Sequence, residues 1–138
     1  MPDVRSPAAE VTGFMDTDPL STGTDSLAFS VSREPGYAVL SVAGDVDAGT
    51  EHHFRDALTS VLAHGMPRIV VDLSGVNFMS SAGIGVLMGV RRVLADAGGS
   101  VVLASAHGQV AQVLSMTGVG EVIPVTASVA DAVAALGS

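Results

Sequence analysis

Apolar and polar residues alternate where the regular part of the chain begins. In LAFSVSRE (Leu27–Glu34) the large apolar side chains recur at every second position, as in a β-strand with one buried face. The sequence Glu34–Pro35–Gly36 is typical of a turn, and YAVLSVAG (Tyr37–Gly44) is typical of a returning strand. The pattern therefore predicts a β-hairpin.

The spacing of apolar residues then changes to three and four, the period of an amphipathic helix. Over Thr50–His64 one face carries Phe54, Ala57, Leu58, Val61 and Leu62. Thr50 is suited to cap the start of this helix, and Gly65 and Pro67 are expected to end it.

Three further strands are predicted downstream: Arg68–Leu73, Ser100–Ala104 and Val122–Val125. The first is a short apolar run, which is typical of a strand buried on both faces. Pro124 suggests that the last strand lies at a sheet edge, because proline lacks a ladder donor. After Leu73 we expect a turn at Ser74–Gly75, with Phe78–Met79 returning to the interior.

Three further helices alternate with these strands. They run roughly over Ala82–Ala97, over Gln109–Met116, and from a cap at Ser128 through Leu136. The order after the hairpin is α-β-α-β-α-β-α, which implies a largely parallel sheet with right-handed crossovers. The predicted fold class is α/β, with about four helices in one domain over residues 26–138. Residues 1–25 mix Pro, Ser, Thr, Gly and acids without a period, and they are expected to form a flexible acidic arm.

Composition excludes several classes of function. The 138 residues carry six basic and fourteen acidic side chains, a net charge of −8, so a nucleic-acid-binding face is not expected. The absence of Lys and Cys excludes lysine chemistry, disulfides, thiolate nucleophiles and cysteine-based metal sites. Leu73–Val90 is uncharged but too polar and too rich in glycine for a bilayer, and the first residues do not resemble a signal peptide. We expect a cytoplasmic domain without a cofactor.

Histidines and acids offer weaker candidates for chemistry. The histidines are His52, His53, His64 and His107. His52 and His53 are adjacent, so they should diverge by about 100° on a helix and form a poor chelating pair. No metal site is predicted. Asp45 and Asp47 could act as paired acids, but acidic residues are favoured before a helix in any case.

Two serines stand at the predicted start of a helix, Ser80 and Ser81. One of them is expected to cap it, because the first-turn N–H groups are free to bind a side-chain oxygen. The alternative is a hydroxyl presented for phosphorylation, since those N–H groups and the helix dipole favour a phosphate. Phosphoserine adds roughly −1.5 to −2 charges. An unpaired charge buried in an interface costs several kcal/mol, so phosphorylation would eject a partner and leave the fold intact.

Three segments in order resemble one known family. VDLSGVNFMSSAGIGVL is similar to a strand ending D-L followed by F-hydrophobic-D-S-[ST]-G-[LI]-G-hydrophobic-L, the pattern of the STAS domain of bacterial anti-sigma factor antagonists. GDVDAGT (Gly44–Thr50) resembles the family's G-E-L-D segment before the first helix, and LSMTGV (Leu114–Val119) resembles the helix end before the last strand. The resemblance covers about residues 26–136.

This resemblance implies a regulator that is not an enzyme. Such a domain binds a serine-kinase anti-sigma factor, frees the sigma factor and is switched off by serine phosphorylation. By position, Ser81 is the phosphate acceptor, Asp47 the acidic residue beside its loop, and Gly83 the glycine that opens the helix. Ser80 stands where the pattern has an acid, and Ala82 where it has Ser or Thr, so Ser80 is an alternative acceptor.

The expected partner surface combines these positions with one arginine of the same helix. It consists of Asp47, Ser80, Ser81, Ala82, Gly83 and Arg91. The expected partners are the anti-sigma kinase and a serine phosphatase, with no nucleic acid or membrane. A second interpretation, prompted by Ser80 and Ala82, is a non-phosphorylated scaffold in a signalling assembly. A third is an enzyme acting through Ser81, although no G-x-S-x-G motif surrounds that residue.

Overall fold

The strands of the computed structural model form one mixed sheet. The structure describes residues 27–63, 65 and 67–136, so the expected arm over residues 1–25 lies outside the described residues. The elements in chain order are β1 (Ala28–Glu34), β2 (Tyr37–Val46), α2 (Glu51–Ala63), β3 (Arg68–Met79), α3 (Ser81–Asp96), β4 (Ser100–Ala104), α4 (Gly108–Thr117), the 3₁₀ helix η2 (Val119–Glu121), β5 (Val125–Thr126) and α5 (Val129–Ala135).

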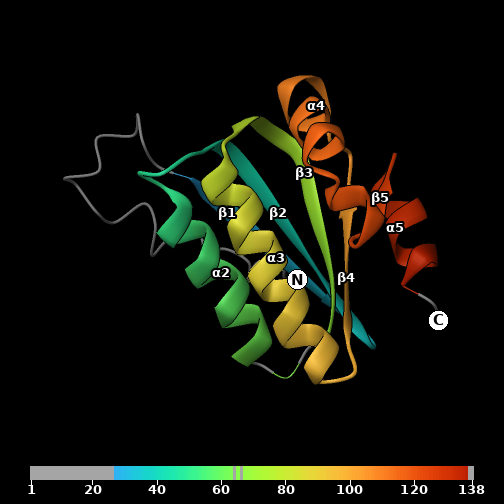
Figure 1. Ribbon diagram of the computed structural model, residues 1–138. Coiled ribbons are helices and arrows are strands. Elements are labelled where there is room, and N and C mark those ends of the chain that lie inside the picture. The colour runs from blue at the N-terminus through green and yellow to red at the C-terminus, as the bar shows by residue number, and fades with distance from the viewer. Residues whose placement is uncertain (1–26, 64, 66, 137–138) are drawn as a thin grey trace.

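The strand order across the sheet is β1-β2-β3-β4-β5 within the described residues. β1 and β2 form the antiparallel hairpin, and every later pair is parallel. The α/β class and the mostly parallel sheet predicted from the sequence are therefore confirmed. In Figure 1, α2 and α3 lie side by side over one face of the sheet, and α4 and α5 lie on the β4 side.

Alternate residues of the central strands serve two cores. Ile69 and Val71 belong to the larger core, which α2 and α3 cover, whereas Val70 belongs to a smaller core with residues of α5. All three side chains are fully buried. This is the strand buried on both faces that the apolar run predicted, because successive strand side chains point to opposite faces.

The turn expected at Ser74–Gly75 is wrong, since β3 continues through it to Met79. A Cβ at Gly75 would lie 2.9 Å from both the Cβ of Ala43 and the carbonyl oxygen of Val42. The glycine is thus required for close approach to β2, where the register shifts. Met79 is buried as predicted, but Phe78 is 40% exposed, which corrects the expectation that both residues return to the interior.

The last strand is also displaced from its predicted position. Val122 and Ile123 belong to a turn that follows η2, in which the N–H of Ile123 donates to the carbonyl of Val119 at 2.8 Å. Only Val125–Thr126 forms β5, although the carbonyl of Pro124 still accepts from the N–H of Leu103 at 2.9 Å. The edge position that the proline suggested is confirmed.

Predicted helix boundaries agree with the structure to within one or two residues. Ser128 caps α5 as expected, with its hydroxyl accepting from the N–H of Asp131 at 3.1 Å. Gly118 ends α4 with φ 76°, a left-handed conformation that glycine adopts without steric cost. The Thr50 hydroxyl, by contrast, turns back to the loop before α2 and bonds to Asp45 and Asp47.

Candidate functional site

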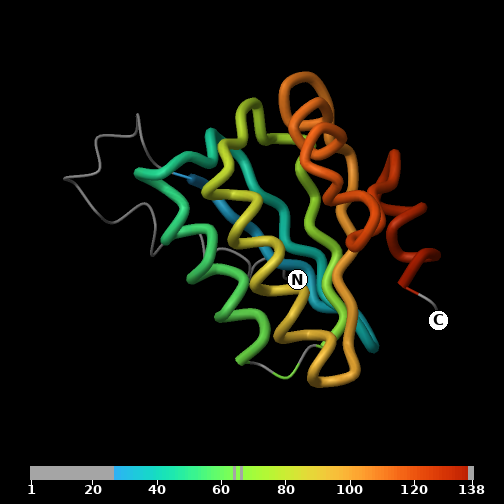
Figure 2. Tube along the Cα trace, viewed as in Figure 1, coloured from blue at the N-terminus to red at the C-terminus, as the bar shows by residue number. Residues whose placement is uncertain are grey.

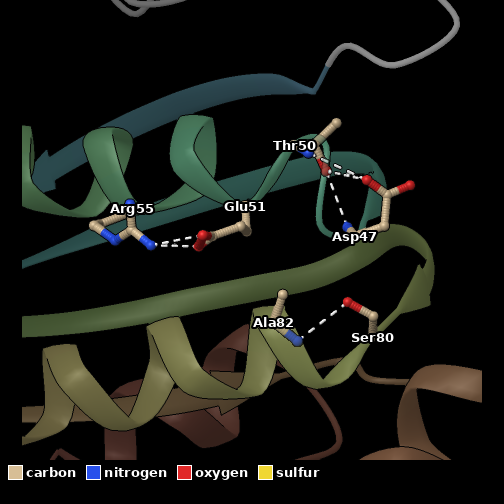
Figure 3. Close-up of polar contacts among 6 residues, drawn as sticks. All are labelled: Asp47, Thr50, Glu51, Arg55, Ser80 and Ala82. Atoms are coloured by element: carbon tan, nitrogen blue, oxygen red, sulfur yellow. Dashed lines mark hydrogen bonds and ion pairs between the residues drawn. The ribbon is translucent and has the colours of Figure 1, made fainter.

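The start of α3 holds both candidate serines, and the two have different surroundings. Ser80 is the N-cap residue, in extended conformation with φ −93° and ψ 177°. Its hydroxyl oxygen accepts a hydrogen bond from the N–H of Ala82 at 3.2 Å (Figure 3). Its side chain is partly buried. Ser80 therefore performs the capping role that one of the two serines was expected to have.

Ser81 presents the more accessible hydroxyl. It is the first residue of α3 and is exposed. Its hydroxyl makes no hydrogen bond to any part of the chain that the structure describes. It also stands in the first helical turn, where N–H groups and the positive end of the helix dipole favour a negative group. The site therefore offers one free hydroxyl in an environment suited to a phosphate.

The loop that carries Asp47 lies beside the start of α3. The N–H of Ser80 donates to the carbonyl of Val46 at 2.8 Å, one residue before Asp47, and the two loops occupy the same end of the sheet (Figure 2). The Asp47 Oδ1 atom accepts from the N–H groups of Gly49 and Thr50 at 2.9 and 3.1 Å. Asp47 thus lies next to the serines, as expected, but one carboxylate oxygen holds its own loop (Figure 3).

Gly83 and Arg91 lie on α3 as expected, but they differ in what they can offer to a partner. Gly83 is buried, and a Cβ there would lie 2.7 Å from both Met79 Cγ and Val46 Cγ1. It contributes close packing of α3 on the sheet, and it offers no surface to a partner. Arg91 is exposed, but it lies about 15 Å further along the helix than Ser81, at about 1.5 Å per residue.

Two residues of the α4 region complete the site, and the sequence analysis missed their role. The side-chain amide of Gln109 accepts from the N–H of Met79 at 2.9 Å and donates to the carbonyl of Met79 at 3.0 Å. The ring Nε2 of His107 lies 2.9 Å from the carbonyl oxygen of Ser74. Both contacts bind α4 to the last half of β3. They depend on tertiary placement, so no local sequence signal could have indicated them.

An open groove of about 480 Å³ runs between α2 and α3, beginning beside Ser81. It is lined by Glu51, Arg55, Thr59, Leu62, Ala82, Gly85, Val86, Gly89, Val90 and Val93. A Cβ at Gly85 or Gly89 would meet nothing within 4 Å, whereas Gly83 packs closely against the sheet. At the rim, Arg55 and Glu51 form an i, i+4 ion pair, which raises the pKa of Arg55 through its hydrogen bond and its charge (Figure 3).

The remaining candidates do not form a second site in the described part of the chain. The rings of His52 and His53 have centroids 4.0 Å apart and planes inclined by 47°, closer than adjacent helix positions suggested. Between Leu27 and Leu136, leaving aside His64 and Met66, no cluster of three or more His, Asp or Glu residues is arranged for a metal ion. His64 lies outside the described residues. None of the described helices has the length and apolar character needed to cross a membrane.

Within the described residues, a five-stranded mixed sheet with helices on both faces, and with an exposed serine at the start of α3, defines a small α/β domain. The family model described as STAS domain matches residues 28–132, which is more than half of the chain. The chain therefore belongs to the STAS domain family, as the sequence resemblance predicted. Anti-sigma factor antagonists that contain this domain are non-enzymatic regulators, which agrees with the expectation that the chain is not an enzyme.

Relatives and solved structures agree with this assignment. The chain is 36% identical over 63 residues to the anti-sigma-F factor antagonist RsfB of Mycobacterium tuberculosis; the match covers 46% of this chain and 52% of RsfB, about half of that relative's length. The crystal structure of an anti-sigma factor antagonist from Mycobacterium paratuberculosis superimposes with TM-score 0.76 at 27% identity, covering 83% of this chain and 97% of that one. The phosphorylated form of Bacillus SpoIIAA superimposes with TM-score 0.60 at 21% identity, covering 78% and 98%, which shows the shared fold.

Proposed function

We propose that this chain binds a serine-kinase anti-sigma factor, thereby releases a sigma factor, and is switched off when its partner phosphorylates Ser81. The observation that carries the proposal is the hydroxyl of Ser81, which is exposed at the first residue of α3 and has no hydrogen bond to the described residues. A kinase needs a hydroxyl that it can reach, and Ser81 offers one on a rigid element. A sigma factor acts on transcription, so we place the protein in the cytoplasm.

Ser81 is a better acceptor than the alternative, Ser80. The Ser80 oxygen already accepts the N–H of Ala82, and its side chain is partly buried. Phosphate transfer to it would require the capping contact to break and re-form around a larger group. Among the residues between Leu27 and Leu136 that are described, none makes such a contact with the Ser81 hydroxyl. The geometry therefore favours the position that the family pattern also indicates.

The serine at position 80 is compatible with this role, although the family pattern has an acid there. Aspartate and serine are both strong N-cap residues, because either side chain offers an oxygen to the first-turn N–H groups. The hydroxyl of Ser80 makes that contact here. It also places a neutral group, and no carboxylate, directly before the Ser81 phosphate. The exchange therefore keeps the helix start and reduces repulsion of the modified side chain.

The groove between α2 and α3 supplies the adjoining contact surface for the anti-sigma factor. It begins at Ala82, directly after Ser81, and its wall includes Gly85 and Gly89, where no side chain prevents close approach. The Glu51–Arg55 pair borders it. An apolar helix of the partner lying in this groove would bring the partner's active site to Ser81. This argument keeps Ser81 and Ala82 in the expected surface and adds residues of α2.

Phosphorylation at this position separates folding from binding. The helix dipole stabilises a negative group at its N-terminus by about 0.3–1 kcal/mol, so the domain would stay folded. In a closed interface the same charge would lack a counterion and cost several kcal/mol. The solved phosphorylated form of SpoIIAA supports the proposal, since a protein with the same fold accepts a phosphate. A serine phosphatase would then restore binding.

The test is phosphorylation by the cognate anti-sigma factor with ATP, followed by peptide mapping with mass spectrometry. We expect one phosphate on Ser81, absent in Ser81→Ala and retained in Ser80→Ala. Phosphate on Ser80 alone would move the switch to that residue. If neither serine is labelled although the two proteins form a complex, the switch is refuted.

A non-phosphorylated scaffold is the second candidate, favoured by Ser80 and Ala82 at the two positions that differ from the family pattern. It predicts a stable self-assembly that forms without any kinase. Size-exclusion chromatography with light scattering, with and without the anti-sigma factor, separates the two functions. If the assembly keeps the same size when the anti-sigma factor is added, the scaffold is supported. A new one-to-one complex with the anti-sigma factor supports the antagonist.

A further inference from the structure

We propose that Gln109 is a positioning residue for Ser81: its side-chain amide takes the place of a missing strand beside the end of β3 and so fixes the main chain that leads to the acceptor. The inference rests on the proposed function and goes further, because it assigns control of the acceptor to a residue of α4. It starts from an unequal length of neighbouring strands.

β3 is much longer than β4, one of the two strands that flank it. β4 pairs with β3 only from Arg68↔Ser100 to Asp72↔Ala104. After Ala104 the chain leaves the sheet, and Ser105 takes φ 65°. β3 nevertheless continues to Met79. Its last residues therefore keep β2 on one side, and no strand of the described residues pairs with them on the other. Main-chain groups on that open side need partners of another kind.

Gln109 supplies both partners that Met79 requires. The N–H of Met79 donates to Oε1 of Gln109 at 2.9 Å, and Nε2 of Gln109 donates to the carbonyl of Met79 at 3.0 Å. The amide thus presents one acceptor and one donor, as a main-chain residue of a strand does. Gln109 is partly buried and Met79 is fully buried. Water is therefore a poor substitute for the amide of Gln109. Without this amide, the N–H and the carbonyl of Met79 would both lack a hydrogen-bond partner.

Met79 connects this contact to the acceptor. Its side chain packs beneath α3, where Met79 Cγ would lie 2.7 Å from a Cβ at Gly83. Ser80, the next residue, is held by β2, because its N–H donates to the carbonyl of Val46. Ser81 follows immediately. The position of the acceptor hydroxyl is therefore set by three elements: β2 through Val46, α3 through Gly83, and α4 through Gln109.

His107 makes a further contact between the start of α4 and β3, at Ser74, which precedes Met79 along the strand. Its Nε2 lies 2.9 Å from the carbonyl oxygen of Ser74, also on β3 beyond the last pairing with β4. The histidine is exposed, however, whereas Gln109 makes two hydrogen bonds to the fully buried Met79. Replacement of Gln109, rather than of His107, is therefore expected to displace Ser81.

The first test needs no partner protein. Amide hydrogen exchange of the full chain is followed by NMR in wild type, Gln109→Met, Gln109→Glu and the control Gln112→Met. Methionine keeps the length of glutamine without its amide, and glutamate keeps the acceptor but loses the donor. Gln112 is exposed on the same helix. We expect the protection of the Met79 N–H to fall roughly tenfold or more in Gln109→Met and less in Gln109→Glu, with wild-type protection in Gln112→Met. Equal protection in all four proteins would refute the inference.

The second test asks whether the contact matters for phosphorylation. With the cognate kinase, we expect kcat for Ser81 to fall roughly tenfold in Gln109→Met while KM changes less than about twofold, because the docking surface is intact and only the acceptor is misplaced. A rise in KM alone, or no change in either constant, would show that Gln109 does not position the acceptor. If wild type is not phosphorylated, the proposed switch fails, and the exchange experiment still decides whether Gln109 holds Met79. If Gln109→Met does not fold, Gln109→Glu carries both tests.

Discussion

Gly83 stands directly against Met79, and the absence of a side chain at Gly83 allows α3 to reach the sheet. A Cβ at position 83 would lie 2.7 Å from Met79 Cγ, a distance that real Cβ contacts do not show. Met79 in turn precedes the serine pair. The spacing of this helix and this strand therefore determines where the candidate acceptor is displayed.

Gly83→Ala should destabilise the domain. The added methyl group would force Met79 or Val46 out of position, and overpacking of this kind typically costs about 1–3 kcal/mol. The matched control is Gly85→Ala on the same helix, where the new Cβ meets open space. That change should be neutral or stabilise by up to about 1 kcal/mol, because alanine favours helix. Urea unfolding measures both, and equal stability of the two variants would contradict the packing argument.

The two serines should differ in their contribution to stability. Ser80→Ala removes the oxygen that accepts the N–H of Ala82, and we expect a loss of about 0.5–2 kcal/mol. Ser80→Asp should retain most of the cap. Ser81→Ala removes an exposed hydroxyl that bonds to none of the residues the structure describes, and it should change stability by less than about 0.5 kcal/mol. Thermal unfolding of the three variants is the measurement. A loss in Ser81→Ala as large as that in Ser80→Ala would mean that the roles are reversed.

Local patterns predicted most of this fold because each helix and most strands follow one period. The hairpin, the strand buried on both faces and the cap at Ser128 all depend on residues close in sequence. The errors have a common physical origin in contacts made across the sheet. Gly75 was interpreted as a turn because glycine favours turns, but it meets Ala43 of β2. Residues 122 and 123 were assigned to a strand because they are apolar, but the N–H of Ile123 closes a turn with Val119.

The candidate site likewise has features that the local sequence predicts and features that depend on contacts between distant segments. Capping chemistry and the family pattern indicated Ser80 and Ser81, and the structure separates them by exposure and bonding. Gln109 could not be predicted, because its role depends on β4 being shorter than β3. The groove likewise requires the placement of α2 beside α3.

A negative charge at Ser81 should weaken binding to the anti-sigma factor without loosening the fold. Ser81→Asp places a carboxylate at the helix N-terminus, where the dipole stabilises it by about 0.3–1 kcal/mol. Ser81→Asn has nearly the same shape and no charge. We expect calorimetric titration to show affinity at least about tenfold weaker for Ser81→Asp than for Ser81→Asn, with more stable or unchanged folding. Equal affinities of the two variants would show that charge is not the signal.

The loop beside the serines should depend on the hydroxyl of Thr50. Thr50 is 1% exposed, and its Oγ1 donates to the carbonyl of Asp45 and accepts the N–H of Asp47. Thr50→Val keeps the volume but leaves these main-chain groups unpaired, at a cost of about 1–3 kcal/mol. Thr59→Val, at an exposed position of α2, is the control and should be nearly neutral. Urea unfolding compares them, and a neutral Thr50→Val would contradict the view that this hydroxyl holds the loop.

Filling the groove between α2 and α3 should separate partner binding from stability most clearly. Gly89 lines the groove, and a Cβ added there meets no heavy atom within 4 Å. Gly89→Leu should therefore fold at least as stably as wild type, since leucine favours helix, yet its side chain would occupy the space proposed for the anti-sigma factor. Ala95→Leu adds a leucine to an exposed position of α3 outside the groove and serves as the control. We expect binding to weaken roughly tenfold or more in Gly89→Leu and to stay unchanged in Ala95→Leu when both are measured by calorimetry. If Gly89→Leu binds as tightly as wild type, the partner does not enter this groove, and its contact with Ser81 must be made from another direction.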